Sequence, residues 1–355
     1  MNSQSLESIA NALVADGKGI LAADETIGTL TKRFERLKIG STPESRRDYR
    51  ELLFTTPGSA EFISGVIMYD ETIRQQDSRG RPLADILAKQ GITPGIKVDA
   101  GAKPLAGSEG ESITEGLEGL RDRLREYHTI GARFAKWRAV IRITDRLPSS
   151  MCVRANANAL GRYASLCQEQ DIVPIVEPEV LMDGSHTIER CNEVTGRVLH
   201  AVFNALYEHE VSLEGILLKP NMVLSGSLCP VQASVMEVAE ATLRCLRRHV
   251  PATVPGVVFL SGGQSDVAAT KHLNAISQIP ESRPWKISFS YGRALQDKAL
   301  ATWLGNAKRY RPAQQAYFQR AKCNAAAVLG KYNATMDSKF IREITQAQHS
   351  DCEDD

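Results

Sequence analysis

The sequence of 355 residues has no pair of cysteines at C-x-x-C spacing and no histidines at H-x-H or H-E-x-x-H spacing. Its seven cysteines are widely spaced and odd in number, which is typical of reduced intracellular thiols rather than of a disulfide framework. The seven histidines are equally scattered. We therefore expect no histidine-based metal site.

An excess of charge of one sign is also lacking. Lys and Arg number 43 against 42 Asp and Glu, a net charge of +1. Binding to nucleic acid or to an anionic membrane surface draws on a basic excess, so we expect neither partner. No stretch approaches the length of apolar residues that spans a membrane, and residues 1–19 lack the basic and apolar regions of a signal peptide. We therefore expect a cytoplasmic protein.

What the sequence does contain is a series of eight short apolar runs, rich in Ile, Val, Leu or Phe and bounded by Gly, Pro or charge. Such runs are typical of parallel strands that are buried on both faces. They are residues 19–24, 64–71, 95–99, 134–138, 173–179, 215–220, 256–263 and 286–293.

Segments with helical periodicity lie between these runs, among them residues 113–131, 196–210 and 235–249. Eight strand–helix units of about 38 residues predict a (β/α)8 TIM barrel of the α/β class. An open doubly wound sheet is the alternative, but it usually has fewer strands and often a G-x-G-x-x-G turn, and no such turn follows the first run.

No linker or shift in composition divides the chain, so we expect one barrel domain over residues 1–355. A helix over residues 5–15 precedes the first run, and another over 313–332 follows the last. The pattern then weakens, and residues 333–355 are expected to form a mobile C-terminal tail.

Charged and polar side chains stand at the C-terminal ends of these runs, where a barrel forms its active site. A single one could be a salt-bridged residue of the rim, but many buried charges on one face are costly unless they are paired. They are Asp24, Lys97, Lys136, Arg138, Glu177, Lys219, Ser261 and Arg293.

The cations among them predict a phosphorylated ligand. Lys136 and Arg138 are two residues apart and project to the same side of their strand. Crowding and desolvation lower the pKa of a lysine, which favours the neutral amine of a Schiff-base nucleophile. Lys219, preceded by two leucines and followed by Pro220, is the favoured nucleophile, and Lys136 is the alternative.

Carboxylates and glycine-rich turns complete the predicted site. Glu177 and Glu179 are candidates for proton transfer, although a carboxylate in such a Pro-containing turn can also cap a helix, and Asp24 is a further candidate. The turns SGGQS (261–265) and SYGR (290–293) follow the seventh and eighth runs, where barrels typically bind phosphate. The arginine of the second turn could add a bidentate contact.

Nine segments together are similar to those of class I fructose-1,6-bisphosphate aldolases, over about residues 10–332. They are KGILAADE, GIKVD, PLAG, ARFAKWR, NANALGRYASLCQ, IVPIVEPEVL, LLKPNMV, FLSGGQS and SFSYGRAL. The resemblance implies a barrel, usually a homotetramer, without metal or other cofactor. It also implies reversible cleavage of fructose 1,6-bisphosphate to dihydroxyacetone phosphate and glyceraldehyde 3-phosphate in glycolysis or gluconeogenesis.

By position, the resemblance implies that Lys219 forms the Schiff base, that Glu177 is the acid/base of carbinolamine chemistry, and that Asp24 deprotonates the C4 hydroxyl. It implies an electrostatic role for Lys136 and a supporting role for Arg138. The implied site of the ketose phosphate comprises Ser261, Gly262, Gly263, Ser290, Gly292 and Arg293. The remaining implied contacts, mainly at the other phosphate, are those of Arg33, Arg46, Lys97, Thr26 and Thr29.

Three features depart from the family pattern. The turn Asp24-Glu25-Thr26-Ile27 has threonine where serine is common, and Ala100 stands where lysine is often found. The sequence ends in Asp355, where many members end in a tyrosine that is thought to protonate the enamine. We therefore expect a tail that is not a strong catalytic element, slow protonation and accumulation of the enamine; substitution of the tyrosine by His349 is the alternative.

Two other functions remain as alternatives. Other Schiff-base barrels, such as transaldolase-like enzymes, would not need two phosphate sites. A catalytically silent sugar-phosphate-binding or scaffolding protein would be expected to have lost the lysine or its acid/base partners, whereas Lys219, Glu177 and Asp24 are all present. The sequence leaves open the preference among fructose 1,6-bisphosphate, fructose 1-phosphate and sedoheptulose 1,7-bisphosphate.

Overall fold

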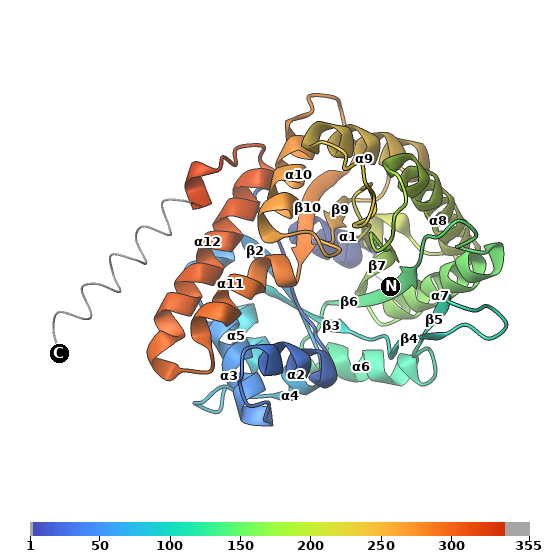
Figure 1. The fold of residues 1–355 in the computed structure, drawn as a ribbon. Helices are drawn as coiled ribbons and strands as arrows, with labels where there is room; N and C mark the ends of the chain where they lie inside the picture. The colour runs from blue at the N-terminus through green and yellow to red at the C-terminus, as the bar shows by residue number, and fades with distance from the viewer. Residues whose placement is uncertain (1–2, 338–355) are drawn as a thin grey trace.

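A computed structural model describes residues 3–337 of the chain. Eight parallel strands form a closed barrel in the order β1-β10-β9-β8-β7-β6-β3-β2, with helices arranged around them (Figure 1). Each strand overlaps one of the eight predicted runs, which confirms the (β/α)8 barrel. The strands are β1 (Gly19–Ala23), β2 (Ile63–Met68), β3 (Thr93–Lys97), β6 (Phe134–Ile141), β7 (Val173–Val180), β8 (Leu217–Leu218), β9 (Gly256–Phe259) and β10 (Lys286–Tyr291).

Most of the long helices begin at a hydroxyl cap. Ser149, Thr187, Ser234 and Ser265 each accept a hydrogen bond from a backbone N–H three residues later, which satisfies a donor that the first turn leaves free. The helices are α1 (Ser3–Leu13), α2 (Ile27–Arg36), α3 (Pro43–Phe54), α4 (Asp70–Arg74), α5 (Leu83–Lys89), α6 (Leu120–Ile130), α7 (Ser150–Glu169), α8 (Ile188–Glu208), α9 (Val235–His249), α10 (Asp266–Gln278), α11 (Arg293–Trp303) and α12 (Tyr310–Val328).

The helix predicted over residues 113–131 is wrong in its first third. Residues Ser112–Glu115 form β5, which pairs antiparallel with β4 (Gly101–Pro104) in a hairpin beside the barrel. Gly116 and Gly119 follow with φ of +121° and +64°, a backbone conformation that favours glycine and turns the chain before α6 begins. The leucine spacing was therefore helical only from Leu120 onward.

The barrel interior is apolar at the N-terminal ends of the strands, where α1 closes it. α1 and the residue after it contribute Leu6, Ala10, Leu13 and Val14 to one buried cluster with the barrel residues Ile20, Ala22, Ile67, Phe134, Val173, Ile175, Leu217 and Val258. A Cβ on Gly95 would lie 2.3 Å from the ring of Phe134, so the glycine leaves the space that this ring fills. α1 lies near the centre of the view in Figure 1.

Residues 331–337 pack beside α12. Arg320 Nη1 donates to Asp337 Oδ1 at 2.6 Å, and the Tyr332 hydroxyl donates to Asp337 Oδ2 at 2.5 Å. The expectations for His349 and Asp355 lie outside the described residues. Within residues 3–337 the six cysteines are buried and free, and no helix is long and apolar enough to cross a bilayer.

Candidate active site

A cavity of about 540 Å³ opens at the C-terminal ends of the strands. Its lining brings together fifteen of the residues that the sequence singled out: Asp24, Thr26, Thr29, Arg33, Lys97, Lys136, Arg138, Glu177, Glu179, Lys219, Ser261, Gly262, Ser290, Gly292 and Arg293. A groove of about 650 Å³ lies at the other end, between α1 and the segments that lead into β9 and β10, and contains none of them. The predicted site residues therefore lie together in the smaller cavity.

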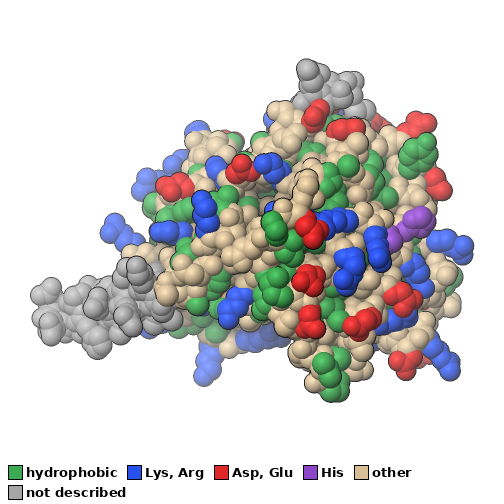
Figure 2. Space-filling model, turned by 90° about the horizontal axis from the view of Figure 1, so that it is seen from above, with side chains coloured by type: hydrophobic (Ala, Val, Ile, Leu, Met, Phe, Trp, Pro, Cys, Tyr) green, Lys and Arg blue, Asp and Glu red, His purple; other side chains and the backbone are tan. Residues whose placement is uncertain are grey.

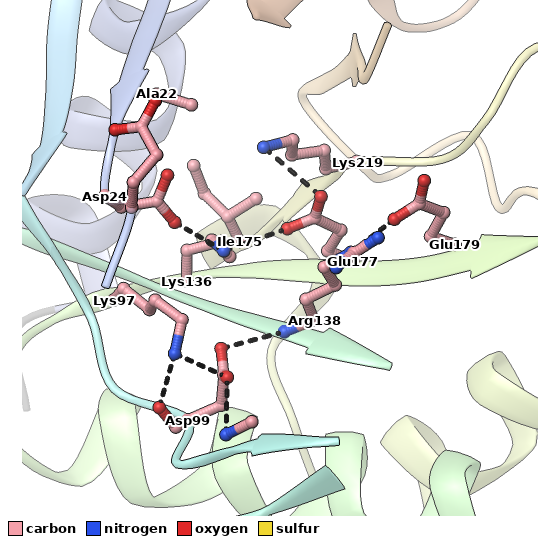
Figure 3. A network of polar contacts seen from close by, with 12 residues as sticks. Ala22, Asp24, Lys97, Asp99, Lys136, Arg138, Ile175, Glu177, Glu179 and Lys219 are labelled. Atoms are coloured by element: carbon pink, nitrogen blue, oxygen red, sulfur yellow. Dashed lines mark hydrogen bonds and ion pairs between the residues drawn. The ribbon is translucent and has the colours of Figure 1, made fainter. Parts of the chain in front are cut away.

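Four side chains of alternating charge run across the cavity floor, of which Lys219, Glu177 and Lys136 are buried and Asp24 is partly exposed (Figure 3). Lys219 Nζ lies 3.3 Å from Glu177 Oε1, and the other oxygen of Glu177 lies 3.4 Å from Lys136 Nζ. Lys136 Nζ in turn lies 2.5 Å from Asp24 Oδ2. A nucleophile candidate and two carboxylates are thus connected through one central ammonium group.

The charges of Asp24 and Lys136 stabilise each other. Burial favours the neutral form of Asp24, but the ammonium groups of Lys136 and Lys219 outweigh it and hold the pKa of Asp24 well below its usual range. Burial of Lys136 is likewise outweighed by Asp24, Glu177 and Asp99, so the pKa of Lys136 is raised. The expectation that crowding lowers the lysine pKa is therefore wrong for Lys136, because carboxylates rather than cations are its nearest neighbours.

Lys219 is held by the backbone on both sides of it. Its N–H donates to Val176 O of β7 at 2.8 Å, and Pro220 O accepts from Leu260 N at 3.1 Å. The next residue, Asn221, accepts from Val180 N at 3.0 Å through Oδ1. The short strand β8 therefore delivers the lysine at a fixed position between its two neighbouring strands.

A second pair of ion pairs lies toward the rim. Arg138 is paired with Glu179, and Lys97 Nζ donates to Asp99 Oδ1 at 2.6 Å. Asp99 Oδ2 also accepts from Arg138 N at 3.3 Å, and Gly101 N donates to its Oδ1 at 3.1 Å. Sequence reasoning missed Asp99. The signal was available, because Asp99 is two residues after Lys97 in GIKVD, and residues two apart in an extended segment point to the same side.

The turn after β9 and the start of α11 offer donors for an anion. Gly262 and Gly263 have φ of +57° and +94°, and this pair of left-handed residues shapes the turn. The Ser290 hydroxyl lines the cavity at the end of β10, is buried, and has no hydrogen-bond partner among the described residues. Arg293 begins α11 directly after Gly292. A buried hydroxyl without a partner, beside a helix N-terminus and an arginine, suits a phosphate group.

Helix α2 adds further cations to the same cavity. Lys32 and Arg36 line it and were missed, although their spacing of four residues on one helix was a usable signal. Arg33 also lines it, but its guanidinium is paired with Glu25 and, at 2.8 Å, with Asp297. The cavity thus carries positive charge over more than one phosphate-sized region.

Two predicted residues lie outside the lining. Arg46 on α3 donates to both oxygens of Glu71, at 2.8 and 2.6 Å, and is held there. Gly263 follows the lining residue Gly262, and a Cβ on it would lie 3.9 Å from Arg293 Nη2. Gly263 therefore remains beside the anion turn, whereas Arg46 is engaged elsewhere.

The described residues contain no group of three or more His, Cys, Asp or Glu side chains arranged to hold a metal ion. Acidic and basic side chains are interspersed over the face shown in Figure 2, in keeping with the net charge of +1. The described residues on the face shown in Figure 2 therefore have no excess of positive charge like the one in the cavity.

The comparisons with known proteins agree with this geometry. The family model of class I fructose-bisphosphate aldolase matches residues 5–350. The chain is 56% identical over 336 residues, 94% of its length and 99% of the other's, to a probable class 1 fructose-bisphosphate aldolase of Xanthomonas campestris pv. campestris. It is 51% identical to human fructose-bisphosphate aldolase B, over 94% of this chain and 92% of that one.

A solved structure of the Plasmodium falciparum fructose-bisphosphate aldolase, in complex with TRAP and a small-molecule inhibitor, superposes with a TM-score of 0.92. The sequences are 47% identical, and the match covers 93% of this chain and 96% of that one. Fold, cavity and sequence identity over nearly the whole length lead to one conclusion: the chain belongs to the class I fructose-bisphosphate aldolase family.

Proposed function

We propose that the chain catalyses the reversible aldol cleavage of fructose 1,6-bisphosphate to dihydroxyacetone phosphate and glyceraldehyde 3-phosphate, in glycolysis and gluconeogenesis, through a Schiff base on Lys219 and without a metal or other cofactor. The observation that carries the proposal is the row of ion pairs Lys219–Glu177–Lys136–Asp24 in a cavity whose lining also includes several other Lys and Arg side chains. It supports the roles that we propose for Lys219 as nucleophile, Glu177 as acid/base and Asp24 as second base, because the three are connected through Lys136.

Schiff-base formation uses Lys219 and Glu177. Glu177, 3.3 Å from Nζ, can take a proton from the Lys219 ammonium group, and the neutral amine that remains attacks the C2 ketone. A second amine proton passes to the carbonyl oxygen, which gives the carbinolamine. Glu177 then returns its proton to the carbinolamine hydroxyl, which leaves as water. The iminium that forms is an electron sink, which is the role that a metal ion fills in metal-dependent aldol chemistry.

Cleavage of the carbon–carbon bond uses Asp24. Asp24 accepts the proton of the C4 hydroxyl, the C3–C4 electron pair moves into the iminium, and the aldehyde product leaves an enamine on Lys219. The lowered pKa keeps Asp24 in the carboxylate form that this step needs. Lys136 remains an ammonium group, and its fixed charge favours the carboxylate form of Asp24 before the proton transfer.

Binding of the two phosphates accounts for the remaining cavity residues. Ser261, Gly262, Ser290 and Arg293, with the adjacent glycines, would hold the phosphate next to the ketone. The cations of α2 and Lys97 would meet the other phosphate, with hydroxyls from Thr26 and Thr29. Glu179 would orient Arg138 at the rim. We further propose that the chain acts as a homotetramer in the cytoplasm, which light scattering of the purified protein would check for the oligomer.

Borohydride trapping tests the central step. Reduction in the presence of dihydroxyacetone phosphate should add the mass of this ketone less one oxygen atom to the peptide that contains Lys219, because the Schiff base forms with loss of water and the reduction adds two hydrogens. Lys219→Arg should form no adduct and cleave no bisphosphate, because a guanidinium stays protonated and cannot attack a carbonyl. An adduct found only at Lys136, or activity that EDTA removes and zinc restores, would contradict the proposal.

A further inference from the structure

Gln296 on α11 is a fully buried side chain whose amide joins four parts of the fold. Its Nε2 donates to Ala22 O at 2.6 Å and to Glu25 Oε1 at 3.0 Å. Its Oε1 accepts from the Tyr49 hydroxyl at 3.1 Å and from Arg33 Nη1 at 3.4 Å. One amide group therefore connects α11 to the end of β1, to the turn after it, to α2 and to α3.

The two groups that accept from Gln296 Nε2 lie on either side of Asp24 in the chain. Ala22 is two residues before it and Glu25 is one residue after it. Asp24 itself lies 2.5 Å from Lys136. Gln296 thus binds the main chain two residues before Asp24 and the side chain of the residue after it.

Glu25 is suited to act as the acceptor because its charge is maintained in the interior. Burial opposes that charge, but Arg50 and Arg33 outweigh burial and lower the pKa of Glu25. Arg50 Nη2 donates to Glu25 Oε2 at 2.7 Å, while Arg33 pairs with the same oxygen that Gln296 contacts. Glu25 therefore stays an anion whose position depends on these three donors.

We propose that Gln296 is a positioning residue for aldol cleavage: through Ala22 and Glu25 it holds the carboxylate of Asp24 where that group removes the proton of the C4 hydroxyl. The inference rests on the proposed function, because it takes Asp24 to be the base of the cleavage step. Gln296 makes none of its hydrogen bonds to Lys219 or Glu177, so formation of the Schiff base does not depend on it.

The test separates cleavage from Schiff-base formation. Gln296→Met keeps the length of the side chain and removes both ends of the amide. We expect kcat for bisphosphate cleavage to fall about tenfold or more. Trapping of dihydroxyacetone phosphate on Lys219 by borohydride should stay within about twofold of the unsubstituted protein. A role confined to stability would not separate the two readouts.

A matched control is available on α12. Gln314 is also buried and donates through Nε2 to Leu52 O at 3.1 Å and to Thr55 Oγ1 at 3.2 Å, near α3 but away from the cavity. Gln314→Met removes a comparable buried amide. It should leave both cleavage and trapping within about twofold.

A double-mutant cycle with Asp24→Asn identifies the group through which Gln296 acts. If the effect passes through Asp24, Gln296→Met should cause little further loss in the Asp24→Asn protein. Equal fold losses in the two backgrounds would overturn the proposal. Normal cleavage by the Asp24→Asn protein alone would instead show that Asp24 is not the base of the cleavage step, and would thus contradict the proposed function. This outcome is distinct from equal fold losses in the two backgrounds.

Gln296→Glu provides a second variant, since it retains the acceptor toward Tyr49 and lacks the donor toward Ala22. It should show the same selective loss of cleavage. Cleavage within about twofold in either variant, or a parallel loss of cleavage and trapping, would overturn the proposal. Loss of the fold in both variants while Gln314→Met folds would assign Gln296 a structural role and overturn it as well.

Discussion

The two ends of the barrel are built from the same strands with opposite chemistry. On β6, Phe134 lies in the apolar cluster that α1 closes, and Lys136, two residues later on the same face, lies in the cavity. On β7, Ile175 and Glu177 repeat this change, and Leu217 and Lys219 repeat it around β8. Burial alone therefore does not decide whether an interior position of the barrel holds an apolar or a charged residue.

What differs between the two ends is the presence of compensating partners. Each charge on the cavity floor faces an opposite charge within 3.4 Å, as Lys136 does on both sides. At the other end the neighbours are aliphatic side chains and one aromatic ring. A buried charge is tolerated only where a side chain of opposite charge lies beside it.

The largest effect is expected from moving a charge into the apolar end. Leu217→Lys places an ammonium two residues before Lys219, on the same face but without a carboxylate. We expect a loss of more than about 4 kcal/mol in the free energy of unfolding, enough to prevent folding. Urea unfolding measures it, and Leu217→Met should cost less than about 1.5 kcal/mol. If Leu217→Lys melts within a few degrees of the unsubstituted protein, the apolar end of the barrel tolerates an unpaired charge and our interpretation of the two ends is wrong.

A somewhat smaller effect is expected where the apolar end is most tightly filled. Gly95→Ala brings a Cβ to 2.3 Å from the Phe134 ring, so it should cost about 1–3 kcal/mol of stability through overpacking. Gly95→Ala combined with Phe134→Leu should recover part of that loss, because the smaller side chain yields the space. Additive losses in the double variant, read by thermal melting, would show that the ring is not the obstacle. Activity per folded molecule should change little.

At the charged end, the ion pair of Asp24 should make the free energy of unfolding depend on pH. The pKa of Asp24 is lowered on folding, so its pairing stabilises the fold above the usual carboxyl pKa of about 4, and this stabilisation is lost as the pH falls. The Asp24→Asn protein lacks this pH-dependent stabilisation, because an amide does not ionise. We expect the unsubstituted protein to lose about 1 kcal/mol more than the variant between pH 5 and pH 3. Parallel unfolding curves across that range would be inconsistent with a buried ion pair.

For Lys136 the dependence has the opposite direction. Its raised pKa contributes stability below the usual lysine pKa of about 10, and this contribution is lost only as the pH rises further.

The smallest effect is expected from an unpartnered group of the charged end. Ser290→Ala removes a buried hydroxyl that has no hydrogen-bond partner among the described residues, so stability should change by less than about 0.5 kcal/mol. If the hydroxyl binds phosphate, KM should rise about tenfold, the equivalent of about 1.4 kcal/mol. Arg46→Met is the matched control, because Arg46 is paired with Glu71 outside the cavity and should leave KM within about twofold. An unchanged KM in Ser290→Ala would remove that hydroxyl from the phosphate site.

The barrel and its charged end were predictable from local pattern. A strand buried on both faces reads as a continuous apolar run, and a charge at the end of such a run, as at Lys219, marks the end where active sites form. The alternation along β6 likewise predicted that Lys136 and Arg138 lie on one side, and both line the cavity.

What local pattern could not predict depends on contacts between distant segments. The state of Lys136 is decided by carboxylates of β7 and of the turn after β1, not by its neighbours in ARFAKWR. Glu25 reads as one more surface residue until Arg33, Arg50 and Gln296 surround it. The hairpin at 101–115 was concealed because Leu117 happened to continue the spacing of the helix that follows.

The cavity cannot form during synthesis until the barrel closes between β1 and β10. The hydrogen bond from Gln296 to Ala22 spans 274 residues, and the cavity shares Asp24 from the first strand with Ser290 from the last. Pairing at such separation cannot occur until nearly the whole barrel has left the ribosome, and contacts of this range slow folding. The nascent chain can pair β1 with β2 early, but the other edge of β1, which pairs with β10, stays open through most of its synthesis. Onset of activity then reports the closing of the ring rather than the formation of any single strand–helix unit.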